Sequence, residues 1–288
     1  MAGKADFAPV VASYLLGVTA AGVLLTILPL SQAWDAFAAD LLATLVVFGF
    51  SRAYRNSSFY DPYWSVIPPL LAGWWMWQHP GSAATPRAWL VTVLVWLWAI
   101  RLTTNWSVHW GGLRHEDWRY PLVRGRAGRF ALPADLFGIH LYPTLQVFLG
   151  CLPIYAVMSR TGAPLSWLDG LAAVVTLGAI VIETVADLQL HAFIARRQPG
   201  TFITTGLWAW SRHPNYFGEV SFWWGLMLFG LAAAPACWWW ILPGALSMTL
   251  MFQFASIPFM DNRSLERRPA YAEHMRKVSA LLPLPPRR

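Results

Sequence analysis

Charged and amide side chains recur every four residues in three otherwise apolar stretches. They are the pair Arg101 and Asn105, the pair Asn215 and Glu219, and the run Glu183, Asp187 and His191. Residues four apart share one face of a helix, and ionisable groups at membrane depth are costly and by default functional. The spacing therefore predicts a shared polar cavity. The alternative is that these groups pair between helices and fix their packing.

The stretch 211–219, with the sequence SRHPNYFGE, is the most informative in the chain. Proline is favoured in the first turn of a helix, so we expect a helix to begin at Pro214. Its free backbone N–H groups and positive dipole end would then lie beside Arg212 and His213, which suits a phosphate or carboxylate ligand. An ordinary capped helix start is the alternative, but it does not account for the polar pair one turn apart.

Composition places this chemistry in a membrane. Charged residues make up 12% of the 288 residues and hydrophobic residues 57%, and there are 19 tryptophans. A soluble domain has about 25% charged residues, so a soluble enzyme and a disordered chain are both poor fits. Two cysteines cannot form a disulfide scaffold or a Cys-rich metal site. The histidines show no metal-ligand spacing, and we predict no metal site.

Eight apolar segments are long enough to suggest membrane helices, which need about 20 residues each. They cover residues 9–30, 36–51, 63–79, 87–110, 134–158, 165–190, 214–234 and 236–258. The first lacks a small-residue cleavage site, and we expect it to be retained. The sequence predicts an all-α polytopic membrane helix bundle of about eight transmembrane helices, with seven as the alternative. It would form a single integral membrane domain over residues 1–288.

The basic residues are distributed very unevenly between the two sides of this bundle. Of the 21 Lys and Arg residues, 18 fall on the side that holds both termini, two on the other, and Arg101 lies inside a segment. Basic loops stay in the cytoplasm, so we expect a multi-pass protein with both termini cytoplasmic, in a bacterial inner membrane. Orientation thus explains the net charge of +7, and we predict no nucleic-acid partner.

Several motifs resemble one membrane-enzyme family. SRHPNYFGE is followed by FWWG and preceded by ETVADLQL, and further matches are SRAYRNSSFYDPYWSVIPP, RLTTNW, EDWRY and the tail from residue 260. Together they resemble the bacterial branch of the steroid 5-alpha-reductase-like family, also labelled DUF1295. The steroid reductases of that family have seven spans. In them, the last three helices and their cytoplasmic loops enclose NADPH, which implies a cofactor-binding half at about residues 165–288.

The resemblance implies particular cofactor-binding residues. The matching positions are Arg101, Asn105, Asp187, Asn215, Tyr216 and Glu219. NADPH also carries phosphates that arginine can bind bidentately, and the candidates beside those positions are Arg196, Arg197, Arg212, His213 and Arg263. The chain has neither a Rossmann glycine fingerprint nor a P-loop, so a nucleotide would be held in another way.

The resemblance also implies a catalytic proton donor. Reducing a conjugated C=C bond requires a group that protonates or polarises the carbonyl oxygen. The family's glutamate aligns with Asp61 and its tyrosine with Trp98, which cannot act as an acid. Tyr60 or Tyr63 could supply a phenol instead. A structural alternative for Asp61 is a helix cap before Pro62.

Other functions stay open at this point. The hydride acceptor would be a lipophilic small molecule from the membrane, such as a 3-oxo-steroid, an enone or an enoyl lipid. An S-adenosylmethionine-dependent methyltransferase of the isoprenylcysteine carboxyl methyltransferase type is the main alternative, and a non-enzymatic membrane protein or transporter is the third. The loop 115–120 (HEDWRY) is either a solvated charge run or a lid over the cofactor.

Overall fold

The computed structural model describes residues 4–28 and 32–287. These residues form helices and no strand, and one isolated bridge pairs Ser211 with Ser279. The all-α prediction is therefore confirmed. By internal contacts the chain divides into two compact units, Met1–Thr161 and Gly162–Arg288. The second unit covers nearly the same stretch as the predicted cofactor-binding half.

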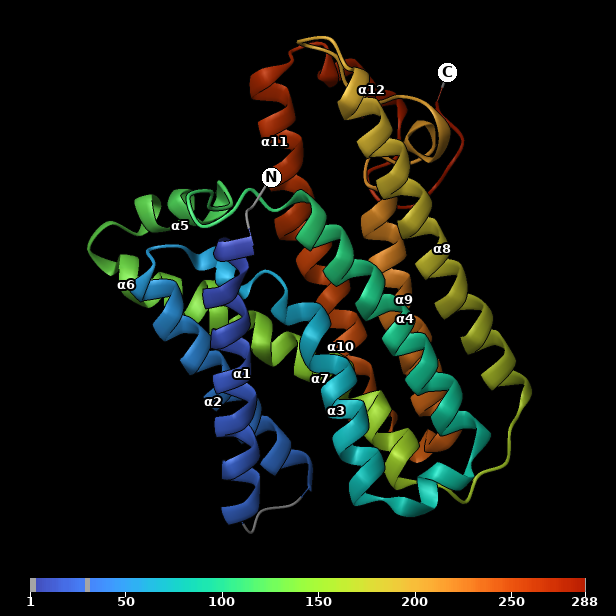
Figure 1. Ribbon diagram of the computed structural model, residues 1–288. Coiled ribbons are helices and arrows are strands. Elements are labelled where there is room, and N and C mark those ends of the chain that lie inside the picture. Colours follow the sequence, from blue (N-terminus) through green and yellow to red (C-terminus); the bar gives the residue numbers. More distant parts are fainter. Residues whose placement is uncertain (1–3, 29–31, 288) are drawn as a thin grey trace. The chain divides into compact units, whose positions relative to one another are not determined.

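The first unit contains seven helices among the described residues. They are α1 (Lys4–Ile27), α2 (Gln32–Ala53), α3 (Tyr63–Gln78), α4 (Pro86–His109), α5 (Arg119–Ala127), α6 (Ala131–Pro133) and α7 (Tyr142–Ser159). Short 3-10 or π segments join them, namely η1 (Ser57–Tyr60), η2 (Pro80–Ala84), η3 (Gly128–Phe130) and η4 (Ala134–Leu141). Helix α1 packs on α2, α3 packs on α4 and α7, and α5 packs on α6 and η4 (Figure 1). Trp75 and Trp98 are fully buried in this unit's core.

The second unit is organised around one long pair of helices. Its elements are α8 (Trp167–Arg196), η5 (Gly206–Ala209), α9 (Pro214–Ala233), η6 (Pro235–Cys237), α10 (Trp238–Met251), η7 (Phe252–Ser256), α11 (Ile257–Arg267) and α12 (Tyr271–Lys277). Helices α8 and α9 lie side by side (Figure 1), and α10 packs on α9. Helix α9 begins at Pro214, as predicted.

Two glycines allow α8 and α9 to approach closely. A Cβ atom at Gly218 would lie 2.9 Å from the carbonyl oxygen of Ala179, and one at Gly225 would lie 3.0 Å from the backbone nitrogen of Thr176. Because the two glycines are seven residues apart, they lie on the same face of α9. The absence of side chains along this line brings the two backbones together, as small residues do between membrane helices.

Six helical segments of the described chain are long and apolar enough to cross a membrane. They are Asp6–Ile27, Ala33–Ala53, Pro86–His109, Arg119–Ser159, Trp167–Arg196 and Pro235–Arg267. Each of the eight predicted segments overlaps a helix, although residues 29 and 30 of the first lie outside the described residues. Helix α3 has only 16 residues, and α9 carries Asn215 and Glu219 near its start. Membrane character is thus supported, while a count of eight is not confirmed.

Candidate functional site

Asp61 lies at the turn between η1 and α3, where it meets a phenol from a distant helix. The hydroxyl of Tyr120, at the start of α5, donates a hydrogen bond to the Asp61 carboxylate across 59 residues of sequence. Removal from water raises the pKa of Asp61 to about 6, against the opposing effects of Tyr120 and the nearby Arg119. A carboxyl group with a pKa near neutrality can act as a general acid.

The capping alternative for Asp61 is wrong. Helix α3 has Pro62 at its N-cap position, and no side-chain capping bond is present there. The Asp61 side chain instead accepts from Tyr120. The carboxyl group is therefore held at the end of the turn by a tertiary contact.

Tyr60 and Tyr63, the other predicted proton donors, are both buried and bonded within the core of the first unit. The hydroxyl of Tyr60 lies 2.6 Å from the Thr144 hydroxyl, and the hydroxyl of Tyr63 donates to Asp40 over 2.7 Å. Their rings stack on each other with centroids 4.7 Å apart. Both phenols thus lie near Asp61 in sequence, but each already has a polar partner other than Asp61.

The loop around residues 111–120 is fastened onto this turn. Asn56 donates to the carbonyl oxygen of Leu113 over 2.9 Å, and the backbone N–H of Ser57 donates to Glu116 over 2.7 Å. The backbone N–H of Asp117 donates to the Ser58 hydroxyl over 3.0 Å. Because these bonds hold the Glu116 side chain and the loop backbone to the turn, the interpretation of the loop as a solvated charge run is wrong.

A buried carboxylate, Asp135, supports the same turn from η4. It is fully buried and accepts from the Ser57 hydroxyl over 2.8 Å and from Arg52 over 3.2 Å. Arg124 bonds both Ser57, at 3.0 Å, and Glu116. A buried charge is tolerated when it is paired and hydrogen-bonded. This network therefore holds the turn and the loop in one geometry.

In the second unit, the predicted polar faces of α8 and α9 meet. The Asn215 amide donates to the Asp187 carboxylate over 3.3 Å. Gly218 lies against the side chain of Glu183, and Glu219 accepts from the indole N–H of Trp223 over 2.9 Å. The bond between Asn215 and Asp187 is the pairing between helices that the sequence analysis gave as the alternative, and the shared polar cavity stays a prediction. The four-residue spacing did not predict the bonding partners.

Arg212 and His213 hold the C-terminal segment onto the start of α9. Arg212 donates to the Asp261 carboxylate, at 2.7 Å, and to the carbonyl oxygens of Met275 and Val278. His213 also bonds Asp261, at 3.0 Å, and its ring stacks on Tyr216. Asp261, which is buried, is thus shared by two basic side chains. In the described structure, most of the donors of Arg212 are engaged by the chain itself.

The remaining candidate residues lie at more open positions. Arg196 and Arg197 are exposed at the end of α8. Burial lowers the pKa of Arg268, and the nearby positive charges of Arg197 and Arg267 lower it further. Arg197, at the end of α8, is therefore close enough to Arg268, at the end of α11, to disfavour its positive charge. Arg263, which is partly buried, lies on α11 of the same unit.

Arg101 and Asn105 lie on α4, in the first unit. Both are partly buried, and one helical turn separates them. Trp98, on the same helix, is fully buried.

Three residues that organise these sites were not among the candidate catalytic or cofactor-binding residues of the sequence analysis. Tyr120 was visible only as the end of the EDWRY motif, and Asp261 and Tyr271 only as part of the tail. Tyr271 donates to Asp261 over 3.2 Å. A polar residue at a helix end is a weak signal by itself, because its partner lies tens of residues away.

Comparisons with known proteins identify relatives but no activity. The family described as "Protein of unknown function (DUF1295)" matches residues 47–278. A protein of the fission yeast Schizosaccharomyces pombe, "Uncharacterized protein C594.04c", is 28% identical over 262 residues, which cover 83% of this chain and 76% of the yeast protein. No solved structure matches the chain.

Proposed function

The chain belongs to the DUF1295 family, and we propose that it is a membrane-embedded, NADPH-dependent reductase of the steroid 5-alpha-reductase-like type. Its substrate would carry a C=C bond in a lipophilic molecule such as a 3-oxo-steroid, an enone or an enoyl lipid. The observation that carries the proposal is the bonded pair of Asp61 and Tyr120, because burial raises the pKa of this carboxyl to about 6.

The pair supplies the proton that such a reduction needs. When bound, NADPH would supply the hydride. Asp61 is protonated below a pH of about 6 and would donate its proton to the carbonyl oxygen conjugated to the C=C bond. Protonation of this oxygen makes the C=C bond more electrophilic, so that it accepts a hydride more readily. The Tyr120 hydroxyl would then stabilise the resulting carboxylate by its hydrogen bond. The network around Asp135 would keep both groups in place.

The polar face between α8 and α9 fits the amide and hydroxyl groups of a dinucleotide. The bonded pair Asp187 and Asn215 offers both acceptors and donors, and Glu219 lies one turn further along α9. Arg196, Arg197 and Arg263 would provide cations for the phosphates. S-adenosylmethionine has no phosphate, so the clustered arginines favour NADPH over the methyltransferase alternative.

We further propose that all eight predicted segments cross the membrane of a bacterial cell and that both termini lie in the cytoplasm. The 18-to-2 distribution of basic residues supports this orientation. Reporter fusions after residues 160 and 287 would test it. A fusion at residue 287 that reports from outside the cytoplasm would overturn the orientation.

The reductase proposal is tested with purified protein in detergent. We expect the protein to retain NADPH rather than S-adenosylmethionine in mass spectrometry, and to oxidise NADPH when an enone or enoyl lipid is added. Asp61→Asn should lower turnover by about 100-fold or more, the usual contribution of a general acid, while NADPH binding stays unchanged. Glu266→Gln is the control, because it removes an exposed carboxylate that has no part in the Asp61–Tyr120 pair. Full turnover in Asp61→Asn, or retention of S-adenosylmethionine alone, would overturn the proposal.

A further inference from the structure

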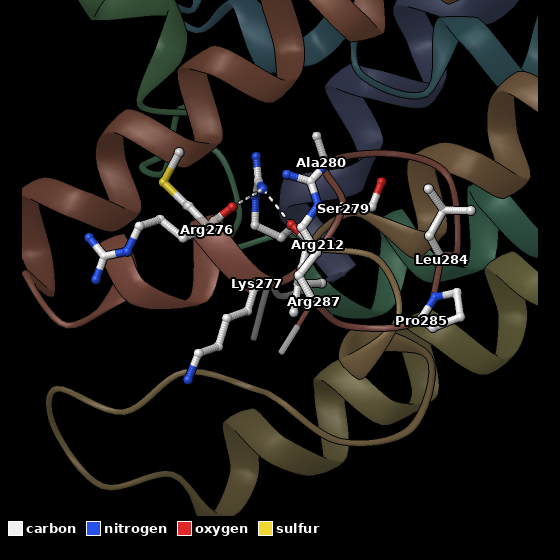
Figure 2. Close-up of a pocket in the computed structure, with 10 residues that line it drawn as sticks. Arg212, Arg276, Lys277, Ser279, Ala280, Leu284, Pro285 and Arg287 are labelled. Carbon is white, nitrogen blue, oxygen red and sulfur yellow. Dashed lines mark hydrogen bonds between the residues drawn. The ribbon is translucent and has the colours of Figure 1, made fainter.

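The C-terminal segment of the second unit lines an open cavity of about 230 Å³. Four of its lining residues are basic, namely Arg212, Arg276, Lys277 and Arg287, and Ser279 adds a hydroxyl (Figure 2). No carboxylate residue is among those that line it. The cavity therefore combines strong positive charge with a hydrogen-bond donor.

Backbone hydrogen bonds hold the walls of this cavity. The N–H of Arg212 donates to the carbonyl oxygen of Ser279 over 2.9 Å, and that of Leu284 donates to Trp210 over 3.1 Å. The N–H of Arg287 donates to Lys277 over 2.8 Å, which closes the segment back onto the end of α12. Because these bonds use main-chain groups, this part of the wall does not depend on the side chains of Arg276, Lys277 and Arg287.

The charges in the cavity are only partly compensated. Asp261 balances Arg212, and Glu273 pairs with Lys277 at 2.7 Å. Both members of the second pair are more than half exposed, and such surface pairs contribute little to stability. Lys277 can therefore exchange Glu273 for another anion at small cost.

The other donors are available to a ligand. The guanidinium groups of Arg276 and Arg287 and the hydroxyl of Ser279 make no hydrogen bond with any residue in the described ranges. Figure 2 shows the side chains of Arg276 and Lys277 extending away from Arg212. Long exposed side chains of this kind can fold over a ligand by rotamer changes, which take only picoseconds to nanoseconds.

We propose that this cavity binds the phosphate group of an anionic ligand. Phosphate oxygens accept charge-assisted hydrogen bonds, and arginine offers them a bidentate fork. The phosphate could belong to a soluble nucleotide or to the headgroup of an anionic phospholipid, because both present the same group to the cavity. The inference does not require reductase activity, since none of its residues is part of the Asp61–Tyr120 pair.

The test measures binding of two probes to the full chain in a neutral detergent. Adenosine 2′,5′-bisphosphate represents the soluble source of phosphate, and adenosine is its uncharged counterpart. Short-chain phosphatidylglycerol represents the anionic lipid, and phosphatidylcholine, which has no net charge, is its counterpart. The test variant is Arg276→Gln with Arg287→Gln. The control variant is Arg114→Gln with Arg160→Gln, which removes the same charge from exposed positions of the first unit.

We expect at least one phosphate probe to bind the wild-type protein in preference to its counterpart. The test variant should weaken that binding about tenfold or more, whereas the control variant should leave it unchanged. Binding of the bisphosphate alone assigns the site to a soluble phosphate, and binding of phosphatidylglycerol alone assigns it to a lipid. Ser279→Ala provides a second variant, expected to weaken binding less, should the double variant unfold. The proposal is overturned if neither probe binds, if the test variant binds normally, or if the control variant weakens binding equally.

Discussion

Replacing Gly225 by alanine should destabilise the second unit, because the α8–α9 interface leaves no room for a methyl group. A Cβ atom there would overlap the Thr176 hydroxyl oxygen and would lie 3.0 Å from the Thr176 backbone nitrogen. Thr176 is fully buried, and its hydroxyl donates to the carbonyl oxygen of Ala172 over 2.7 Å. Rotating the hydroxyl away would break that bond and would still leave the backbone contact.

The size of the effect follows from two opposing terms. Overpacking a well-packed interior costs about 1–3 kcal/mol, whereas alanine in place of glycine favours a helix by about 1 kcal/mol. Since the clash includes backbone atoms that only a helix displacement can relieve, we expect a net loss of about 1–2 kcal/mol in the free energy of unfolding. For a chain of this size, that loss corresponds to a fall of roughly 2–8 °C in melting temperature.

The assay is thermal unfolding in one detergent, followed by near-ultraviolet circular dichroism. Gly178→Ala on α8 is the matched control, because a Cβ atom there meets nothing within 4 Å, and it should unfold at the wild-type temperature or slightly above. Adding Thr176→Ala to Gly225→Ala should restore part of the loss, since it removes the hydroxyl but not the backbone contact. Equal melting temperatures for Gly225→Ala and Gly178→Ala would refute the close packing of the two helices.

Three further predictions concern the two polar sites. Tyr120→Phe removes a hydrogen bond that lowers the pKa of Asp61, so this pKa should rise above about 6 in an infrared titration of the carboxyl band; an unchanged value would contradict the pairing. Because the pKa of Asp61 in the folded protein exceeds its usual value of about 4, its contribution to stability is fully present below pH 4 and is lost as the pH rises through 6. The melting temperature of Asp61→Asn should therefore vary less than that of the wild type between those pH values, and identical profiles would count against the shift. Asp261→Asn leaves the buried charge of Arg212 uncompensated, at a cost of about 3–5 kcal/mol, and should expose residues 278–287 to limited proteolysis; wild-type protease resistance would contradict the role of Asp261.

The sequence by itself determined where most helices lie and which of their faces are polar. Apolar runs, the first-turn preference of Pro214 and the four-residue spacing of Asp187 with Glu183 are local signals, because they depend on the geometry of one helix. The helix start at Pro214 was accordingly predicted correctly. Six of the eight predicted segments lie in helices with the length and hydropathy of a membrane span, so the count of eight is not confirmed by these local signals.

Only the tertiary structure decided which groups are partners. Asp61 meets Tyr120 across 59 residues, and Arg212 meets Asp261 across 49. Helix periodicity fixes the face on which a side chain lies, but the neighbour opposite that face depends on how helices pack and at what register. For the same reason, the sequence left Asp61 open between a proton donor and a helix cap, whereas burial in the fold raises its pKa to about 6 despite the hydrogen bond from Tyr120.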